Sequence, residues 1–353
     1  MSIDKKSKLM LFPRIGKFII ILVAIAFIIV GIRGYQLYQY VFSENVKTDY
    51  VLYIQPGATL KQVTDSLKMN DALISLKAFH WVSKKKEYQK SVKAGRYLLK
   101  KGMNTNQIVN MLKGGMQTPL NVTFNNVRTK EEFAGKVSKY LIADSLSILN
   151  LFNNENQIKE FGFDTETYRT MFIPNTYQFY WTTTAEEFAE RMKSEFERFW
   201  NEERRKKAEQ INLTPAEVTI LASIVQSETA KNEELSRIAG LYINRLNRGL
   251  LLQADPTVKY AVGDFSLKRI LNVHLEVDSP YNTYKNAGLP PGPINFPETS
   301  AIDAVLNHEK HNYIYMCAKE DFSGYHSFAV TLDEHNRNAA KYRAALDRNN
   351  IRK

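Results

Sequence analysis

Cysteine and histidine are scarce in this sequence, and their scarcity argues against two kinds of site. Cys317 is the single cysteine among 353 residues, so the chain cannot form an intramolecular disulfide framework. No cysteine stands near the start, so we expect no lipid anchor. The six histidines suggest no metal cluster, and His308-Glu309-Lys310-His311 lacks the spacing of a metalloprotease helix. We therefore expect neither a metal centre nor a cofactor.

Long apolar runs are scarce as well, and a single one approaches the length of a membrane span. Residues 18–32, FIIILVAIAFIIVGI, carry no charge and span about 22 Å as a helix. Lys17 and Arg33 flank the run and can extend their charges to the interface, and three tyrosines follow by residue 40. No small-x-small cleavage site follows, which favours an uncleaved transmembrane anchor over residues 18–40. Basic residues dominate 1–17, which predicts a cytoplasmic N-terminus and an extracytoplasmic remainder.

Acidic side chains are the minority, with 37 Asp and Glu against 48 Lys and Arg. Residues 1–33 hold six Lys and Arg and one Asp, a net +5, which leaves +6 of the total +11 on the exported part. That surplus suits an anionic polymer or a membrane surface, although an ordinary solvated basic surface would carry the same charge. Nucleic acid is a poor partner for an exported domain and no motif for it is present, so we expect none to bind.

A strand–turn–helix pattern recurs after the apolar run. It occupies residues 51–67, 95–112 and 120–141. Units this short cannot bury a face alone, so we expect the copies to pack together or to pair their strands. The expected helix N-caps are threonines: Thr59, Thr105 and Thr129, the last in a capping box with Glu132.

The rest of the chain is predicted to be α+β. Residues 142–210 look helical, apart from a turn at Pro174-Asn175 and an extended segment from Tyr177 to Trp181. Helices, turn-rich loops and two strands near residues 312–319 and 326–329 follow. The predicted divisions are a cytoplasmic segment 1–17, an anchor 18–40, a subdomain 41–118, a linking region 119–210 and a catalytic domain 211–353.

One predicted helix carries an acidic residue on its apolar face. Its start is marked by a threonine N-cap, a proline and a capping-box glutamate: Thr214, Pro215 and Glu217. At about 100° per residue, Glu228 falls on the stripe that includes Leu221, Ile224 and Val225. Such a carboxylate either reaches water at a helix end or is held in a poorly solvated cleft, where a raised pKa would suit it to proton transfer. The next helix, from about Glu233, places apolar residues and Tyr242 inward and ends at Gly249.

Two further segments carry candidate substrate-binding residues. Gln253 and Asp255 precede a proline, so Asp255 is expected either in an Asx-turn or in the substrate cleft. A later segment ends in the stiff, proline-rich stretch 289–294 and is either a structural cover or a wall of the cleft. Its candidate sugar-binding residues are Ser279, Tyr281, Asn282, Thr283 and Tyr284.

Three ordered motifs resemble the endolytic murein transglycosylases, the YceG-like family. They are ILASIVQSETAKNEELSRIAGLYINRLNRGLLLQADPTVKYAVG, SPYNTYKNAGLPPGPINFP and HSFAVTLDEHNRNAAKYR. With the anchor and a LysM-like segment at about 50–116, the resemblance covers most of the chain. It implies a lyase anchored in the cell inner membrane that cuts peptidoglycan strands internally. It also implies peptidoglycan synthases as a candidate class of partner.

The resemblance assigns catalysis to one glutamate, Glu228. The family commonly has a second glutamate where this chain has Gln226, and an aspartate where it has Asn175. A single carboxyl group is sufficient for a lytic transglycosylase, because the muramyl C6 hydroxyl, rather than water, attacks C1 and leaves a 1,6-anhydro end.

Two alternatives remain open at this stage. A lysozyme-like hydrolase would pair Glu228 with a second carboxylate, either Asp255 or Glu276. A non-catalytic scaffold would use the LysM-like segment to bind glycan, and the loss of the usual glutamate at Gln226 is the sequence feature that favours it.

Overall fold

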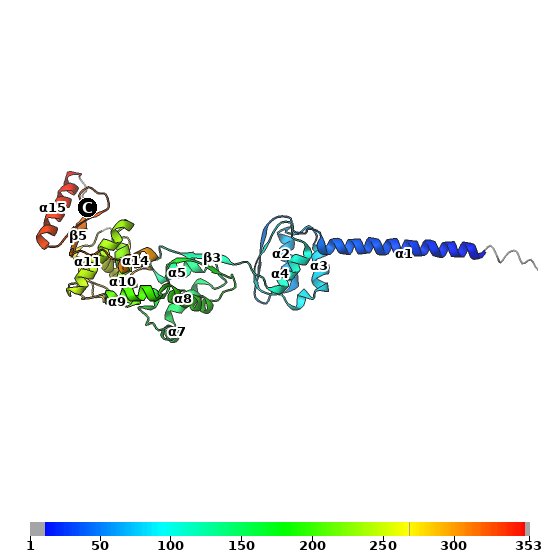
Figure 1. The fold of residues 1–353 in the computed structure, drawn as a ribbon, viewed down its shortest axis with the longest axis horizontal. Helices are drawn as coiled ribbons and strands as arrows, with labels where there is room; N and C mark the ends of the chain where they lie inside the picture. The colour runs from blue at the N-terminus through cyan, green and yellow to red at the C-terminus, as the bar shows by residue number, and fades with distance from the viewer. Residues whose placement is uncertain (1–10, 268, 350–353) are drawn as a thin grey trace, which may run out of the picture. The chain divides into compact units, whose positions relative to one another are not determined.

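The computed structural model describes residues 11–267 and 269–349, which fall into two compact units (Figure 1). One unit runs to Pro119 and includes the short segment Tyr180–Thr182, and the other comprises Leu120–Phe179 and the chain from Thr183 onward. Across the described residues the strands form three separate antiparallel pairs among many helices. The fold class is therefore mixed α+β, as the sequence predicts.

The first unit begins with a long apolar helix, α1 (Leu11–Phe42). Its portion Gly16–Phe42 has 27 residues, and the most apolar 18-residue stretch within it has a mean hydropathy of 2.6 and is wholly exposed. At 1.5 Å per residue this portion is about 40 Å long, which exceeds the roughly 30 Å hydrocarbon core of a bilayer. The helix is thus long and apolar enough to cross a membrane, a property that membrane anchors and signal sequences share.

Two of the repeated strand–helix copies pack together in the first unit. β1 (Tyr50–Ile54) pairs with β2 (Gly95–Leu99), with Tyr50 opposite Leu99 and Ile54 opposite Gly95. The helices of this unit are α2 (Leu60–Met69), α3 (Leu76–Lys85) and α4 (Thr105–Gly114). Apolar residues from both strands and all three helices form one buried core, so each copy covers the face that the other cannot bury alone.

The caps of α2 and α4 test the sequence prediction closely. Thr59 caps α2 and closes a capping box with Gln62, as its position predicts. Asn104, not Thr105, caps α4, and its side chain accepts the N–H of Gln107. The prediction of Thr105 is wrong because that side chain is fully buried, where its hydroxyl accepts a hydrogen bond from Asn45.

The third copy folds in the second unit and does not join the other two. β3 (Leu120–Phe124) pairs with β4 (Asn175–Phe179), so Asn175 begins a strand instead of lying in the predicted turn. The helix α5 (Lys130–Val137) follows β3 and is capped by Thr129, as predicted. Glu132 accepts the N–H of Arg128 instead of that of Thr129, so no capping box closes.

The centre of the second unit is α10 (Pro215–Glu228), which packs against α11 (Leu235–Asn247) and α14 (Thr299–Leu306). The predicted start of α10 is confirmed, and Gly249 follows α11 in the left-handed conformation with φ 63°. β5 (Tyr315–Ala318) pairs with β6 (His326–Ala329), and α15 (Leu332–Arg348) packs on both. The other helices are α6 (Ser145–Asn150), α7 (Glu155–Glu160), α8 (Ala185–Phe199), α9 (Glu202–Gln210), α12 (Asp255–Val262) and α13 (Asn272–Leu275).

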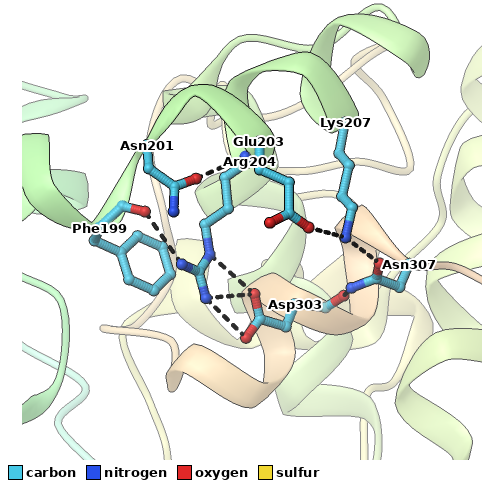
Figure 2. A network of polar contacts seen from close by, with 7 residues as sticks. All are labelled: Phe199, Asn201, Glu203, Arg204, Lys207, Asp303 and Asn307. Carbon is cyan, nitrogen blue, oxygen red and sulfur yellow. Dashed lines mark hydrogen bonds and ion pairs between the residues drawn. The ribbon is translucent and has the colours of Figure 1, made fainter.

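Polar contacts join α9 to α14 (Figure 2). Arg204 makes a two-pronged contact with Asp303, at 3.1 Å from Nε to Oδ1 and 3.3 Å from Nη2 to Oδ2. Lys207 donates to Asn307 at 3.0 Å and pairs with Glu203 at 3.0 Å. Because these groups are partly exposed, the contacts contribute little stability.

Gly240 in α11 lies where the helix meets the chain that follows α14, and it gives a stability prediction. A Cβ atom at Gly240 would overlap the carbonyl oxygen of Glu309 and would lie 2.8 Å from Nε2 of His311. Gly240→Ala should lower the free energy of unfolding by about 1–3 kcal/mol, because a backbone carbonyl cannot move aside easily. Denaturant unfolding of the full chain measures this change.

The matched control is Gly135→Ala in α5, where a Cβ atom would have no neighbour within 4 Å. Alanine is the better helix former, so this variant should be up to about 1 kcal/mol more stable than the parent. Equal stability of the two variants would contradict the packing at Gly240.

Candidate active site

Glu228 is the last residue of α10, and its carboxyl group faces a cleft. Leu221, Ile224 and Val225 on the same helical face are fully buried, whereas Glu228 is only partly exposed. The helix ends there because Thr229 adopts an extended conformation, with φ −142° and ψ 146°. The sequence left open whether Glu228 lies at a helix end or in a poorly solvated cleft. In the structure both descriptions apply, since Glu228 ends α10 and is poorly solvated.

Two cavities adjoin at Glu228. The larger has a volume of about 730 Å³ and the smaller about 340 Å³. Glu228 and Asp255 line both of them, while Gln226 lines the larger and Tyr242 the smaller. Glu228 and Asp255 therefore stand together where the two cavities meet.

Tyr242 of α11 donates a hydrogen bond to Oε1 of Glu228. Burial raises the pKa of Glu228 to about 7, an effect that the Tyr242 hydrogen bond opposes and the negative charge of Asp255 reinforces. Burial and the Glu228 carboxylate also raise the pKa of the Tyr242 phenol, so Tyr242 remains a donor. A carboxyl group with a pKa near neutrality can both give and take a proton, which is what general acid–base catalysis requires.

Asp255 opens the helix α12, with Pro256 next to it, and does not lie in the Asx-turn considered from the sequence. Its Oδ1 accepts the hydroxyl hydrogen of Tyr284 at 2.6 Å. Burial and this hydrogen bond raise the pKa of Tyr284, which keeps the phenol protonated. Asp255 and Tyr284 thus form a second polar pair that lines the smaller cavity together with the Tyr242–Glu228 pair.

Gln253 lines the smaller cavity, but its side-chain oxygen is engaged by Arg245 at 2.7 Å. Arg245 is buried on α11 and also donates to the carbonyl oxygens of Leu251, at 2.8 Å, and Ile314, at 2.6 Å. One guanidinium group therefore joins α11 to the segment before α12 and to the segment leading into β5. Gln253 itself has a φ of 52°, in the left-handed region.

The predicted sugar-binding segment divides into buried positions, which are Tyr281, Asn282 and Thr283, and partly exposed positions, which are Ser279 and Tyr284. Asn282 and Thr283 are buried: Asn282 bonds the carbonyl oxygens of Leu275 and Val277, and the Thr283 hydroxyl accepts the N–H of Ala254. The remaining residues lie elsewhere on the segment: Ser279 accepts the N–H of Tyr281, whose own hydroxyl donates to Glu166 at 2.5 Å. Of the five, Tyr284 is the one that lines a cavity with Glu228, and the others shape the loop that carries it.

The chain departs from the family motifs at Gln226 and at Asn175, and the structure accounts for the first of these only. Gln226 lines the larger cavity, and its side-chain oxygen accepts the N–H of Glu298 at 2.6 Å. A glutamate would offer the same acceptor, so this contact does not need an acid. Asn175 is exposed at the start of β4, bonds the N–H of Thr176 and lines neither cavity with Glu228; nothing in the structure explains an aspartate there.

Three residues that the sequence analysis did not assign to the site contribute to it. Tyr242 and Arg245 are described above, and Glu234, 4% exposed, accepts the backbone N–H and Nδ1 of His326 at 2.8 and 2.9 Å. The sequence did hold a signal for Tyr242, because a tyrosine on an inward helical stripe needs a partner for its hydroxyl. In the described part of the chain, no three His, Cys, Asp or Glu residues are grouped to hold a metal.

The sequence of this chain matches a known protein family along most of its length. The model of the YceG-like family matches residues 52–341 of the chain. The chain belongs to the YceG-like family. A crystal structure of a YceG-like protein from Listeria monocytogenes matches with a TM-score of 0.54 and 27% identity, covering 82% of this chain and 98% of that one.

Curated members of the YceG-like family are also similar to this chain. A Bacillus subtilis protein named endolytic murein transglycosylase is 30% identical over 320 residues, which cover 85% of this chain and 86% of that protein. A Streptococcus pneumoniae protein of the same name is 28% identical over 352 residues, covering 88% of this chain and 62% of that protein. The chain therefore spans nearly all of the first relative and less than two thirds of the second.

Proposed function

We propose that this protein is an endolytic lytic transglycosylase of peptidoglycan in which Glu228 is the catalytic residue. The observation that carries the proposal is the carboxyl group of Glu228, with a pKa of about 7, at the junction of two cavities. A polymer lying through both cavities would place an internal bond, not an end, at this carboxyl group. The relatives named endolytic murein transglycosylase support the same activity.

In the proposed reaction Glu228 acts twice on the β-1,4 bond between N-acetylmuramic acid and N-acetylglucosamine. Its protonated carboxyl group gives a proton to the glycosidic oxygen as the bond from that oxygen to C1 breaks. The resulting carboxylate takes the proton of the muramyl C6 hydroxyl, and the C6 oxygen bonds to C1. The products are a free 4-hydroxyl group and a 1,6-anhydromuramyl end, with no water consumed. Cleavage of this kind within a nascent strand would end its elongation.

The neighbouring groups have positioning and electrostatic roles in this proposal. Tyr242 orients the Glu228 carboxyl group through its hydrogen bond. The Asp255 carboxylate stands where it can stabilise the positive charge that develops at C1. Tyr284 holds Asp255 in place and offers its ring to a sugar. Direct contact of Asn282 and Thr283 with the glycan is not part of this proposal, because both are buried.

A lysozyme-like hydrolase is the second candidate, and Asp255 is the observation that favours it. Its charge raises the pKa of Glu228, and it lines both cavities with that group, so a second carboxyl group is at hand for the nucleophilic or water-activating role that a hydrolase requires. Glu276, the other carboxylate considered from the sequence, pairs with Lys285 at 3.2 Å and lines neither cavity with Glu228. It has no place in either mechanism.

The proposed setting is the outer face of the cell inner membrane. In this proposal α1 is a retained single-pass anchor with a cytoplasmic N-terminus. The subdomain of β1, β2 and α2–α4 is LysM-like and holds glycan weakly, while the second unit cuts it. Peptidoglycan synthases are the class of partner that such a placement would favour.

Release of glycan from isolated sacculi tests the activity itself. Purified full chain should release or shorten glycan strands, and the average strand length should fall before short soluble fragments dominate, as internal cleavage requires. Sacculi left unchanged by folded protein would favour the non-catalytic scaffold instead.

The pH profile of glycan cleavage should follow the charges around Glu228. Because Glu228 must be protonated to act as the acid, the rate should fall as pH rises through about 7. Asp255→Asn removes the negative charge that raises the Glu228 pKa, so this falling limb should move to lower pH. Tyr242→Phe removes the hydrogen bond that lowers the pKa, so the limb should move to higher pH. Measured profiles of kcat/KM that shift in the same direction for both variants would contradict the assignment.

A further inference from the structure

One face of α3 in the first unit presents three lysines around a tryptophan. Lys77 precedes Trp81 by four residues along the helix, and Lys84 and Lys85 follow Trp81 by three and four. This spacing places the four side chains on one side of the helix. The lysines are exposed, Trp81 is partly buried, and Nζ of Lys85 lies 5.7 Å from the Trp81 ring centre. A shallow depression of about 510 Å³ opens between Trp81, Lys77, Lys84 and His80. We call Lys77, Trp81, Lys84 and Lys85 the α3 basic face.

Acidic residues do not offset this charge. The helices α3 and α4, and the described length of α1, contain no Asp or Glu. Asp65 on the neighbouring α2 pairs with Lys61 at 2.8 Å, and Glu87 just after α3 pairs with Lys90 at 2.7 Å. Within the part of the chain that the structure describes, the three lysines of the α3 basic face form no ion pair, so their charge is available to an external anion.

The α3 basic face lies beside the end of the apolar helix. α3 packs against α1 (Figure 1). The ring of Tyr40 on α1 lies 6.4 Å from that of Trp81. The helix is exposed from Lys17 to residue 38 and partly buried from residue 39 to residue 41, where the subdomain covers it. The uncharged run ends at Ile32, so it lies about two helical turns, or roughly 10 Å, from the place where α3 covers the helix.

We propose that the α3 basic face binds anionic phospholipid headgroups at the surface of the membrane that α1 crosses. The proposal rests on the anchoring role proposed for α1 and is independent of the catalytic one. Lysine ammonium groups donate to headgroup phosphates, and a tryptophan beside them suits the interface, where its ring is apolar and its N–H is wet. A partly buried ring with Lys85 across it is a poor stacking platform for a sugar, and the contact of Trp81 with Tyr40 near the end of α1 favours a lipid phosphate over a glycan carboxylate.

Binding of this kind would fix the subdomain against the bilayer. Each lysine near an anionic surface contributes a factor of about five to binding, and the effect weakens as salt screens it. Because the subdomain packs on α1, the anchor alone leaves both free to tilt together relative to the bilayer. A second attachment through α3 would hold it in one orientation at the lipid surface.

The test uses the full chain in nanodiscs of phosphatidylcholine alone or of phosphatidylcholine mixed with phosphatidylglycerol. A membrane-impermeant amine-acylating reagent labels exposed lysines, and mass spectrometry gives the rate at each site. Acylation of Lys77, Lys84 and Lys85 should be about fivefold slower in the anionic discs at low salt, and the difference should shrink at high salt. Lys206, exposed on α9, serves as the reference for reagent reactivity and should not change.

Variants separate this face from charge in general. Lys84→Glu combined with Lys85→Glu should remove the lipid-dependent protection of Lys77. The matched pair Lys61→Glu and Lys68→Glu, on α2, makes the same change in net charge and should leave the protection intact.

Three outcomes would overturn the proposal. Equal acylation in both kinds of disc would show that no anionic lipid is bound. Protection in phosphatidylcholine discs on addition of glycan fragments that contain N-acetylmuramic acid would assign the face to glycan instead. A chain that fails to co-elute with the discs would remove the anchoring role of α1, and this proposal with it. Co-elution with unprotected lysines would remove the lipid-binding role of the α3 basic face alone. None of these results depends on whether the chain cleaves glycan.

Discussion

Glu228→Gln should lower the rate of glycan cleavage by a factor of about 10²–10⁴ or more. The substitution keeps the size of the side chain and leaves an oxygen to accept the Tyr242 hydrogen bond, but an amide can neither donate nor recover a catalytic proton. Because the neutral amide also removes the cost of a buried charge, the fold should be unchanged. The measurement is the initial rate on purified glycan strands, with circular dichroism and thermal unfolding to confirm the fold.

Gln226→Ala is the matched control on the same helix. Gln226 lines the larger cavity, but its role in the structure is to accept the N–H of Glu298 at 2.6 Å. Loss of one such hydrogen bond costs about 1 kcal/mol, so the rate should fall by less than about tenfold. A fully active Glu228→Gln variant, or a larger loss from Gln226→Ala than from Glu228→Gln, would contradict the assignment of catalysis to Glu228.

Arg245→Met should lower the free energy of unfolding by about 3–5 kcal/mol. This is the largest loss of stability that we expect from a single substitution. Arg245 is 7% exposed, and its guanidinium group satisfies two carbonyl oxygens and the side chain of Gln253. Methionine fills similar space but leaves these three acceptors without a donor. Glycan cleavage should fall too, since the segment that leads to Asp255 loses its attachment to α11. Denaturant unfolding and cleavage rates of the same preparation measure both effects.

Arg237→Met provides the control for this prediction, because Arg237 lies on the same helix and makes an exposed ion pair. Its Nε is 2.9 Å from Glu309, and the two side chains are 45% and 41% exposed. Exposed pairs contribute at most about 1 kcal/mol, so this variant should remain nearly as stable as the parent. Similar losses from Arg237→Met and Arg245→Met would show that the buried position of Arg245 carries no special weight.

Local signals in the sequence predicted the helix starts well. Thr59, Thr129 and Thr214 all precede helices in the structure, because a hydroxyl cap with suitable neighbours is a short-range interaction that the sequence displays directly. Thr105 shows where such signals stop. Asn104 and Thr105 can both cap a helix, and the choice depends on Asn45, which lies 60 residues away and takes up the buried hydroxyl.

Strand pairing was less predictable, because it depends on partners distant in sequence. The segment 120–141 repeats the local pattern of the first two copies, yet β3 pairs with β4 and lies in the other unit. The pattern defines an apolar strand and an amphipathic helix but not which core receives them. Asn175 illustrates the same limit, since its turn-like sequence begins a strand once β3 is alongside.

The sequence predicted the central residue of the candidate site, Glu228, but not the arrangement of the residues around it. Glu228 stands out because its neighbours at helical spacing are apolar, and burial of that stripe is what raises its pKa. Tyr242, which donates to Glu228, is on another helix, so the periodicity showed only that it points inward. Asn282 and Thr283 looked like surface sugar-binding residues because polar type suggests exposure, whereas both are buried and bonded within the loop.

The measurement that most directly tests the central claim is the mass of the cleavage products formed in ¹⁸O-labelled water. If Glu228 alone passes a proton between the leaving oxygen and the C6 hydroxyl, no water enters the product. The new ends should then be 1,6-anhydromuramyl groups, one water lighter than reducing ends, with no ¹⁸O incorporated. Reducing ends that carry ¹⁸O would instead show a hydrolase in which Asp255 assists Glu228, and would contradict the single-glutamate mechanism.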